Sequence, residues 1–384
     1  MKRSFLYLFP LLVIPWFGYL YQVNPNETIS VERFEKRDNP YAHSLNIWLT
    51  EKHEDNIDNS EQDGAYARII GRNILNRSWG LTHPLAELSD EMKSYHKLRL
   101  GKEVEFLIQL SKKYNGRFTS GHNQNNIERF ILRNVLDALY RLNEKNIYPE
   151  KIDHWLDAFQ LPVQYQYIHY WNGPRQYQLS FGNNRRAGYY PNADAMYVLL
   201  MGLAAELYDD ENYALRAHEF TRYLENKLLP GGGFNYMHRT CDMPSYHSLV
   251  VTCLARYHEI SGDSLALHLV KESREYYPLT LAPSGITEKT PHPYWKRQMG
   301  MSTGPDPMDI VASISGEGRN KYLAQQKYPP GISVIAVDYW TDNVKPVEPA
   351  TDITFEDPNI NGFRGRFGDF TWLGMLGHGN AVDA

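Results

Sequence analysis

Three segments of the chain, residues 181–192, 231–247 and 284–297, collect histidine, tyrosine, asparagine and basic side chains. Histidine and tyrosine can exchange protons with a substrate, and asparagine, arginine and histidine can neutralise a carboxylate. β-Elimination of a uronate polymer requires these abilities. The C5 proton becomes acidic once the neighbouring carboxylate is neutralised, a base removes it, and an acid protonates the departing O4. The reaction needs no metal, and the sequence predicts no cofactor.

A repeat of helical hairpins places the three segments at equivalent positions. One unit is a helix, a short acidic turn, a second helix and a glycine-containing loop. Because the chain lacks the consensus of known open solenoids, we expect the closed form, an (α/α) toroid, in which equivalent loops share one face. Matching residue pairs recur at offsets of 51 or 52: Leu203-Ala204 with Leu254-Ala255, Ala214-Leu215 with Ala266-Leu267, and Gly233-Phe234 with Gly285-Ile286.

Apolar periodicity predicts helices through most of the remaining chain, as in the stripe formed by Met196, Leu199 and Leu203. The predicted fold class is therefore all-α, an (α/α) toroid with a small C-terminal β appendage. The predicted boundaries are a linker over 24–63, the toroid over 64–325, and a closing segment over 326–384. In the closing segment the sequence predicts a strand at 331–340 and a weaker one at 351–355.

The N-terminus has the features of a targeting segment. Lys2 and Arg3 precede an apolar run from Phe5 to Tyr21, and no small-residue cleavage site follows. We predict a signal peptide or a signal anchor over residues 1–23, with the toroid periplasmic, secreted or membrane-anchored outside the cytoplasm. A net charge of −5 without a basic run argues against a nucleic-acid partner.

Several features of the three segments favour an anionic partner. Two segments run into helices with Asn192 and Ser245 as predicted N-caps, and a helix start presents free N–H groups and a partial positive charge. Basic side chains gathered on a net acidic protein also indicate a specific anionic ligand. They are Arg185, Arg186, Arg239, Lys296 and Arg297.

The glycine-rich run 231–234 followed by His238, and then by Tyr246, resembles the second-loop His and Tyr of (α/α)-toroid polysaccharide lyases. These include the chondroitin, alginate and glucuronan lyases. The resemblance implies a single-domain lyase acting on an acidic polysaccharide, with Asn184, His238, Tyr294 and Arg297 as its catalytic set. Arg185 stands where the alginate-lyase signature has histidine. The segments supply these expected substrate-binding residues: Asn183, Arg185, Tyr190, Arg239, Tyr246, His247, His292 and Lys296.

Three other functions remain open on the same toroid. A glycoside hydrolase needs two carboxylates flanking the bond, for which Asp242, Glu288, Asp306 and Asp309 are candidates. A uronyl C5-epimerase shares the proton abstraction, and a polysaccharide-binding or assembly protein would keep the groove without turnover. Cys241 and Cys253 could pair, and Cys241 lacks the partners of a zinc site.

Overall fold

The computed structural model describes residues 39–53, 64–119, 125–180, 190–236, 240–286, 303–360, 362–368 and 370–375. All of them belong to one compact unit, Arg33–Ala384. The predicted targeting segment over residues 1–23 lies outside the described residues. Within the described ranges, no helix combines the length and the hydrophobicity needed to cross a membrane.

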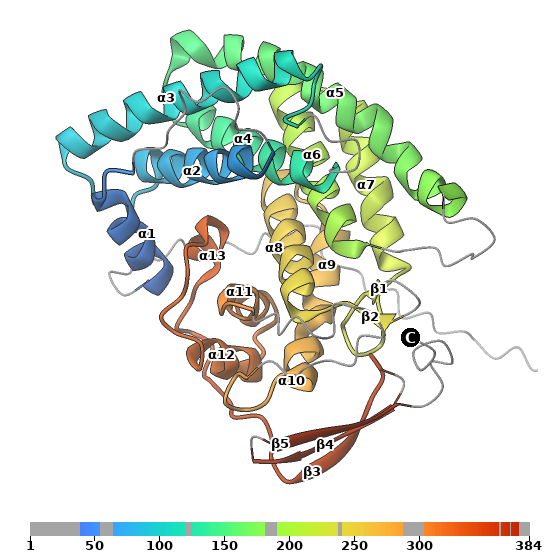
Figure 1. The fold of residues 1–384 in the computed structure, drawn as a ribbon. Helices are drawn as coiled ribbons and strands as arrows, with labels where there is room; N and C mark the ends of the chain where they lie inside the picture. The colour runs from blue at the N-terminus through green and yellow to red at the C-terminus, as the bar shows by residue number, and fades with distance from the viewer. Residues whose placement is uncertain are drawn as a thin grey trace, which may run out of the picture. The chain divides into compact units, whose positions relative to one another are not determined.

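Six helices form a closed inner ring. Each packs against the next, and the last packs against the first, so the ring closes (Figure 1). In chain order they are α2 (Gly64–Thr82), α4 (Asn125–Glu144), α6 (Pro191–Tyr208), α8 (Pro244–Ser261), α11 (Asp306–Ser315) and α13 (Val334–Tyr339).

An outer helix packs against each inner one. The outer helices are α3 (Asp90–Lys113), α5 (Pro149–Ser180), α7 (Glu211–Glu225), α9 (Ser264–Glu272), α12 (Gly318–Gln325) and, against α13, α1 (Pro40–Thr50). This arrangement is an (α/α) toroid, which confirms the predicted fold class. Because α1 and α13 complete the last hairpin, the ring uses residues on both sides of the predicted 64–325 boundaries.

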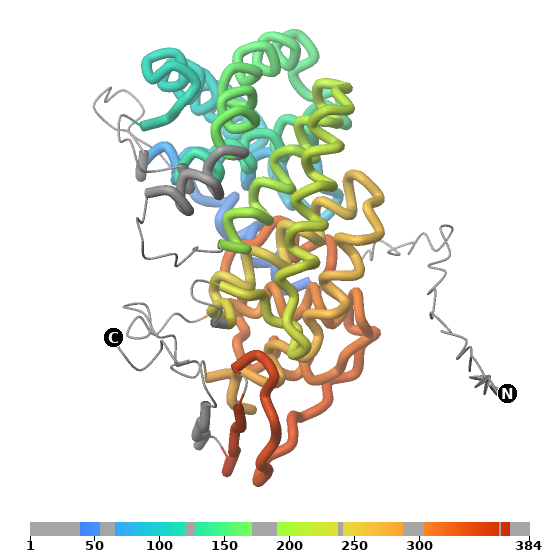
Figure 2. Tube along the Cα trace, turned by 90° about the vertical axis from the view of Figure 1, so that its right-hand side faces the viewer, coloured from blue at the N-terminus to red at the C-terminus, as the bar shows by residue number. Residues whose placement is uncertain are grey.

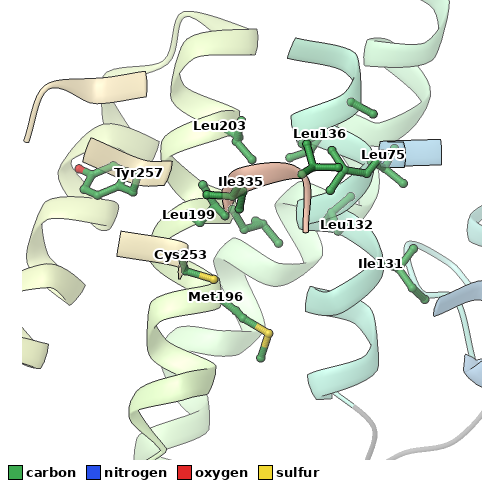
Figure 3. Close-up of a cluster of buried hydrophobic side chains, with 14 of the residues drawn as sticks. Leu75, Ile131, Leu132, Leu136, Met196, Leu199, Leu203, Cys253, Tyr257 and Ile335 are labelled. Atoms are coloured by element: carbon green, nitrogen blue, oxygen red, sulfur yellow. The ribbon is translucent and has the colours of Figure 1, made fainter. Parts of the chain in front are cut away.

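The strand predicted at 331–340 is wrong, because this segment contains α13. Its β-branched apolar residues suit a buried strand and a buried helix equally well. Val334, Ile335 and Val337 are all buried inside the ring, because a helix there is packed against neighbouring helices on several sides. Figure 3 shows Ile335 in one apolar cluster with side chains of other inner helices, among them Leu75, Leu136, Leu199 and Cys253.

The two predicted hairpin repeats have the same loop geometry. Gly232 donates its N–H to the carbonyl of Leu229 at 2.9 Å, and Gly285 donates to that of Ala282 at 2.8 Å. Both glycines have positive φ, 81° and 75°, where a side chain would be strained. The hairpins α6–α7 and α8–α9 therefore end in equivalent loops, in which Gly285 corresponds to Gly232 and not to the predicted Gly233.

Two small antiparallel sheets accompany the helices. Strands β1 (Asn235–Tyr236) and β2 (Thr240–Cys241) pair within the second loop. The second sheet has the order β3 (Ile353–Asp357), β4 (Gly362–Phe367) and β5 (Phe370–Met375), and β3 confirms the weaker predicted strand. Figures 1 and 2 show this sheet on the side of α10 (Tyr276–Thr280) and α12.

A buried ionic cluster joins α2 to α3. Arg77 donates from Nε to both carboxylate oxygens of Glu103 at 3.1 Å, and its Nη1 lies 2.7 Å from Nδ1 of His96. All three side chains are fully buried. Burial lowers the pKa of His96 to about 4, so the ring is neutral and its Nδ1 accepts from Arg77.

Candidate functional site

The inner helices begin on one face of the ring. Since α6 and α8 are each followed by an antiparallel partner across a short turn, they run in parallel. Tyr190, just before α6, lies 5.5 Å from Tyr236 of β1 between ring centroids, and Tyr236 lies 5.6 Å from Tyr246 in the first turn of α8. The described parts of the first two predicted loops therefore meet here. We call this side the helix-start face.

The inner and outer helices differ in how their starts are capped. Among the helix starts that the structure describes, a side-chain oxygen caps α1, α3, α7, α9 and α12. No side chain caps α6, α8, α11 or α13. The predicted caps Asn192 and Ser245 are wrong, because Pro191 and Pro244 begin these helices, so that Tyr190 and Met243 occupy the N-cap positions. The inner helix dipoles thus point uncapped at the helix-start face, which favours an anion.

The glycine-rich loop is held from behind by the β3–β4 turn. Asn359 donates to the carbonyl of Gly231 and accepts from the N–H of Gly233, both at 2.9 Å. A Cβ at Gly233 would lie 2.3 Å from Sγ of Cys241, and one at Gly231 would lie 2.4 Å from the Asn359 amide. Glycine is needed at both positions because Cys241 and Asn359 approach the backbone so closely. The same contacts fix the position of the strand that carries Tyr236.

Asn359→Ala is expected to lower the free energy of unfolding by about 1–3 kcal/mol, because it leaves two buried backbone groups of the glycine-rich loop without partners. Urea unfolding monitored by circular dichroism measures the change. A variant as stable as the wild type would show that Asn359 does not support the loop.

His247 and Asp242 form a buried pair beneath this loop. Nδ1 of His247 lies 3.0 Å from a carboxylate oxygen of Asp242, and the imidazole stacks on Tyr276 at 3.7 Å. The other Asp242 oxygen accepts from the N–H of Phe234 at 2.8 Å. Both members are fully buried. The structure therefore places His247, an expected substrate-binding residue, behind the helix-start face, where it supports the loop.

Two tyrosine side chains are partly exposed on the face itself. Tyr246 and Tyr190 are half-buried, whereas Tyr236 is buried and its pKa is raised by desolvation and by its neighbours Tyr246 and Tyr190. Of the two half-buried tyrosines, Tyr246 is the one that lies within the first turn of an inner helix. Nine predicted site residues lie outside the described residues: Asn183, Asn184, Arg185, His238, Arg239, His292, Tyr294, Lys296 and Arg297.

The carboxylates considered for hydrolysis are mostly engaged. Asp242 is committed to its loop, and Asp309 is buried between Lys321 at 2.7 Å and the hydroxyls of Tyr41 and Tyr328 at 2.7 and 2.6 Å. Glu288 lies outside the described residues. Asp306, at the start of α11, is only half-buried, and burial raises its pKa to about 6.

Asp306→Asn is expected to remove a pH-dependent destabilisation. Below the unfolded-state pKa of 3.8 the carboxyl is protonated in both states and does not affect stability. As the pH rises from there through the folded-state pKa of about 6, the folded state loses stability, because the carboxyl ionises more readily in the unfolded chain. The wild type should therefore lose up to about 3 kcal/mol more than the variant between pH 4 and pH 7. Urea unfolding of both proteins across this range measures the difference, and parallel curves would contradict it.

A cavity of about 580 Å³ lies at the centre of the ring, and each of the six inner helices contributes at least one residue to its lining. Arg68, Arg72 and Arg133 line it, and none of them has a carboxylate within ion-pair distance among the described residues. Sequence reasoning missed this group, although the spacing of Arg68 and Arg72 places both on one helical face. In the same described part, no cluster of three His, Cys, Asp or Glu could hold a metal, and Cys241 and Cys253 are unpaired.

The chain was compared with protein families, curated proteins and solved structures. No family model and no curated protein matches the chain. A solved structure named as a polysaccharide lyase shares 10% sequence identity, with a TM-score of 0.38, over 82% of this chain and 89% of that chain. The likeness concerns the path of the helices at a low TM-score, and it assigns no residue a role.

Proposed function

We propose that this protein is a polysaccharide lyase that cleaves an acidic, uronate-containing polysaccharide by β-elimination on the helix-start face. The observation that carries the proposal is the conjunction of a partly exposed tyrosine with arginines that have no carboxylate partner among the described residues. Tyr246 stands at an uncapped helix start, and Arg68, Arg72 and Arg133 line the cavity enclosed by the same ring.

Anion binding is supported by two independent sources of positive potential. The uncapped starts of α6, α8 and α11 direct their dipoles at the face. The arginines add full charges that no described carboxylate neutralises. A polymer bearing a carboxylate on each sugar matches both sources.

Proton abstraction is assigned to the tyrosines and histidines. Among the described residues the proposed base is Tyr246, which stands half-buried in the first turn of α8 with its ring against Tyr236. His238 and Tyr294 are the other proposed proton-transfer groups, and Asn184 and Arg297 the groups that neutralise the carboxylate. In the reaction the C5–H electron pair forms the C4–C5 double bond, the C4–O4 bond breaks, and O4 takes a proton.

Hydrolysis is less well supported than elimination. It needs a pair of carboxyl groups about 5–9 Å apart on either side of the bond. Asp242 and Asp309 are buried and hydrogen-bonded, so Asp306 is the accessible carboxyl among the described candidates. An epimerase shares the abstraction step and differs in keeping the C4–O4 bond.

The test is incubation with a panel of acidic polysaccharides while the ultraviolet absorbance of the new C4–C5 double bond is followed. A rise with one uronate polymer, and none with its carboxyl-reduced form, is the expected result. Binding of a polymer without any rise across the panel would support the non-catalytic alternative instead.

Export to the compartment that contains such polymers is part of the proposal. Residues 1–30 fused to a reporter that is active only outside the cytoplasm should give activity, because Lys2, Arg3 and the following apolar run are typical of a targeting segment. Reporter activity confined to the cytoplasm would contradict export.

A further inference from the structure

One wall of the central cavity is cationic. Arg68 and Arg72 lie one turn apart on α2, and Arg133 faces them from α4. Phe130 is in contact with two of the guanidinium groups, at 3.9 Å from Arg68 and 5.2 Å from Arg133 measured to its ring centroid. The aromatic ring holds these groups in place without neutralising them.

Three other arginines of the inner ring form ion pairs with acidic residues, in contrast to the arginines of the cationic wall. Arg77 is paired with Glu103, and Arg141 and Arg256 share Asp137. Asp137 also lines the cavity, but those two arginines already neutralise it. The positive charges of the cationic wall repel one another. The pKa of Arg68 is lowered, first by burial and then by the charges of Arg133 and Arg72. A bound anion would relieve this repulsion.

Two buried donors beside this wall lack partners. Nδ2 of Asn76 and Nε of Arg133 make no hydrogen bond in the structure, and Asn76 is only 2% exposed. Buried donors are nearly always satisfied, so an orphan donor on a cavity wall indicates a missing oxygen ligand. Burial of Asn76 inside α2 also rules out the glycan that the pattern Asn76-Arg77-Ser78 would suggest.

The opposite wall suits the uncharged part of a sugar. It carries the hydroxyls of Ser248 and Thr252 on α8 and the carboxyl of Asp306 on α11. These groups can exchange hydrogen bonds with sugar hydroxyls, and an ionised Asp306 would repel a carboxylate. The cavity is therefore polarised, with its anion-binding side at α2 and α4.

We propose that the central cavity is a binding subsite for one acidic sugar, whose carboxylate or sulfate oxygens bind Arg68, Arg72, Arg133 and the amide of Asn76. The inference rests on the proposed function for its choice of a saccharide as the source of the anion. Anion binding by the arginines does not depend on catalysis.

The test is titration calorimetry on the full chain with a uronate oligosaccharide, the carboxyl-reduced oligosaccharide and inorganic sulfate. Arg68→Ala/Arg72→Ala should weaken uronate binding at least about tenfold, because two charge-assisted hydrogen bonds are lost. Both residues are exposed, so the fold should survive, which circular dichroism checks. The matched control is Arg222→Ala, an exposed arginine on the outer helix α7, which should bind like the wild type.

Three results would overturn the inference: unchanged uronate affinity in the double variant, equal affinity for the carboxyl-reduced sugar, or sulfate binding as tight as that of the oligosaccharide. The last would make the cavity an inorganic-anion site. The proposed function fails separately. Uronate binding that depends on the arginines but gives no unsaturated product would support the subsite and contradict the proposed lyase activity.

Discussion

Tyr246→Phe is expected to lower the turnover of an acidic polysaccharide at least about a hundredfold, with little change in stability. Loss of one general base or acid has effects of this size. Tyr246 lies at the helix-start face in the first turn of α8, and its ring stacks on Tyr236, a contact that phenylalanine preserves. Initial rates of double-bond formation at saturating substrate measure the change.

Tyr213→Phe, on the outer helix α7, is the matched control and should keep wild-type turnover. His238→Ala and Tyr294→Phe should each cause a loss comparable to that of Tyr246→Phe if they share the proton transfers. Should Tyr246→Phe keep full turnover while Tyr294→Phe loses it, the base would be Tyr294, and Tyr246 would serve only to pack the loop.

Glu103→Ala is expected to lower the free energy of unfolding by about 3–5 kcal/mol, because it leaves the fully buried Arg77 guanidinium without its counter-ion. His96 cannot compensate, since its neutral Nδ1 is already the acceptor for Arg77. The loss should therefore exceed that of any single exposed ion pair. Urea unfolding at neutral pH, followed by circular dichroism, measures it.

Glu91→Ala provides the control for Glu103→Ala. Glu91 also pairs with a cation, Lys52 at 3.0 Å, but it is largely exposed, so its removal should change stability little. Equal losses in the two variants would contradict the view that burial makes the Arg77–Glu103 pair critical.

The hairpins α6–α7 and α8–α9 and their repeat were predictable because apolar residues recur at helical spacing along them. The closure of the ring was not. The pairing of α1 with α13 joins the first described helix to the last, and no local pattern indicates a contact of that separation. The misread strand at 331–340 has a related cause, since a short, wholly buried apolar run has no polar side that reveals its period.

The site was predictable in part. The sequence marks the loops, and the structure brings the described parts of two of them together through Tyr190, Tyr236 and Tyr246. The sequence does not reveal that His247 faces inward, because the first turn of a helix can expose either of two adjacent residues. Nor does a basic pair such as Arg68 and Arg72 tell whether its face of α2 points to solvent or into the ring.

The most direct test of the central claim is the mass of the products formed from a uronate polymer in heavy-oxygen water. Elimination adds no water, so we expect unsaturated fragments that carry no heavy oxygen, with their masses summing to that of the parent chain. Fragments whose masses sum to that of the parent chain plus one water for each broken bond, with heavy oxygen at the new reducing end, would show hydrolysis and contradict the account.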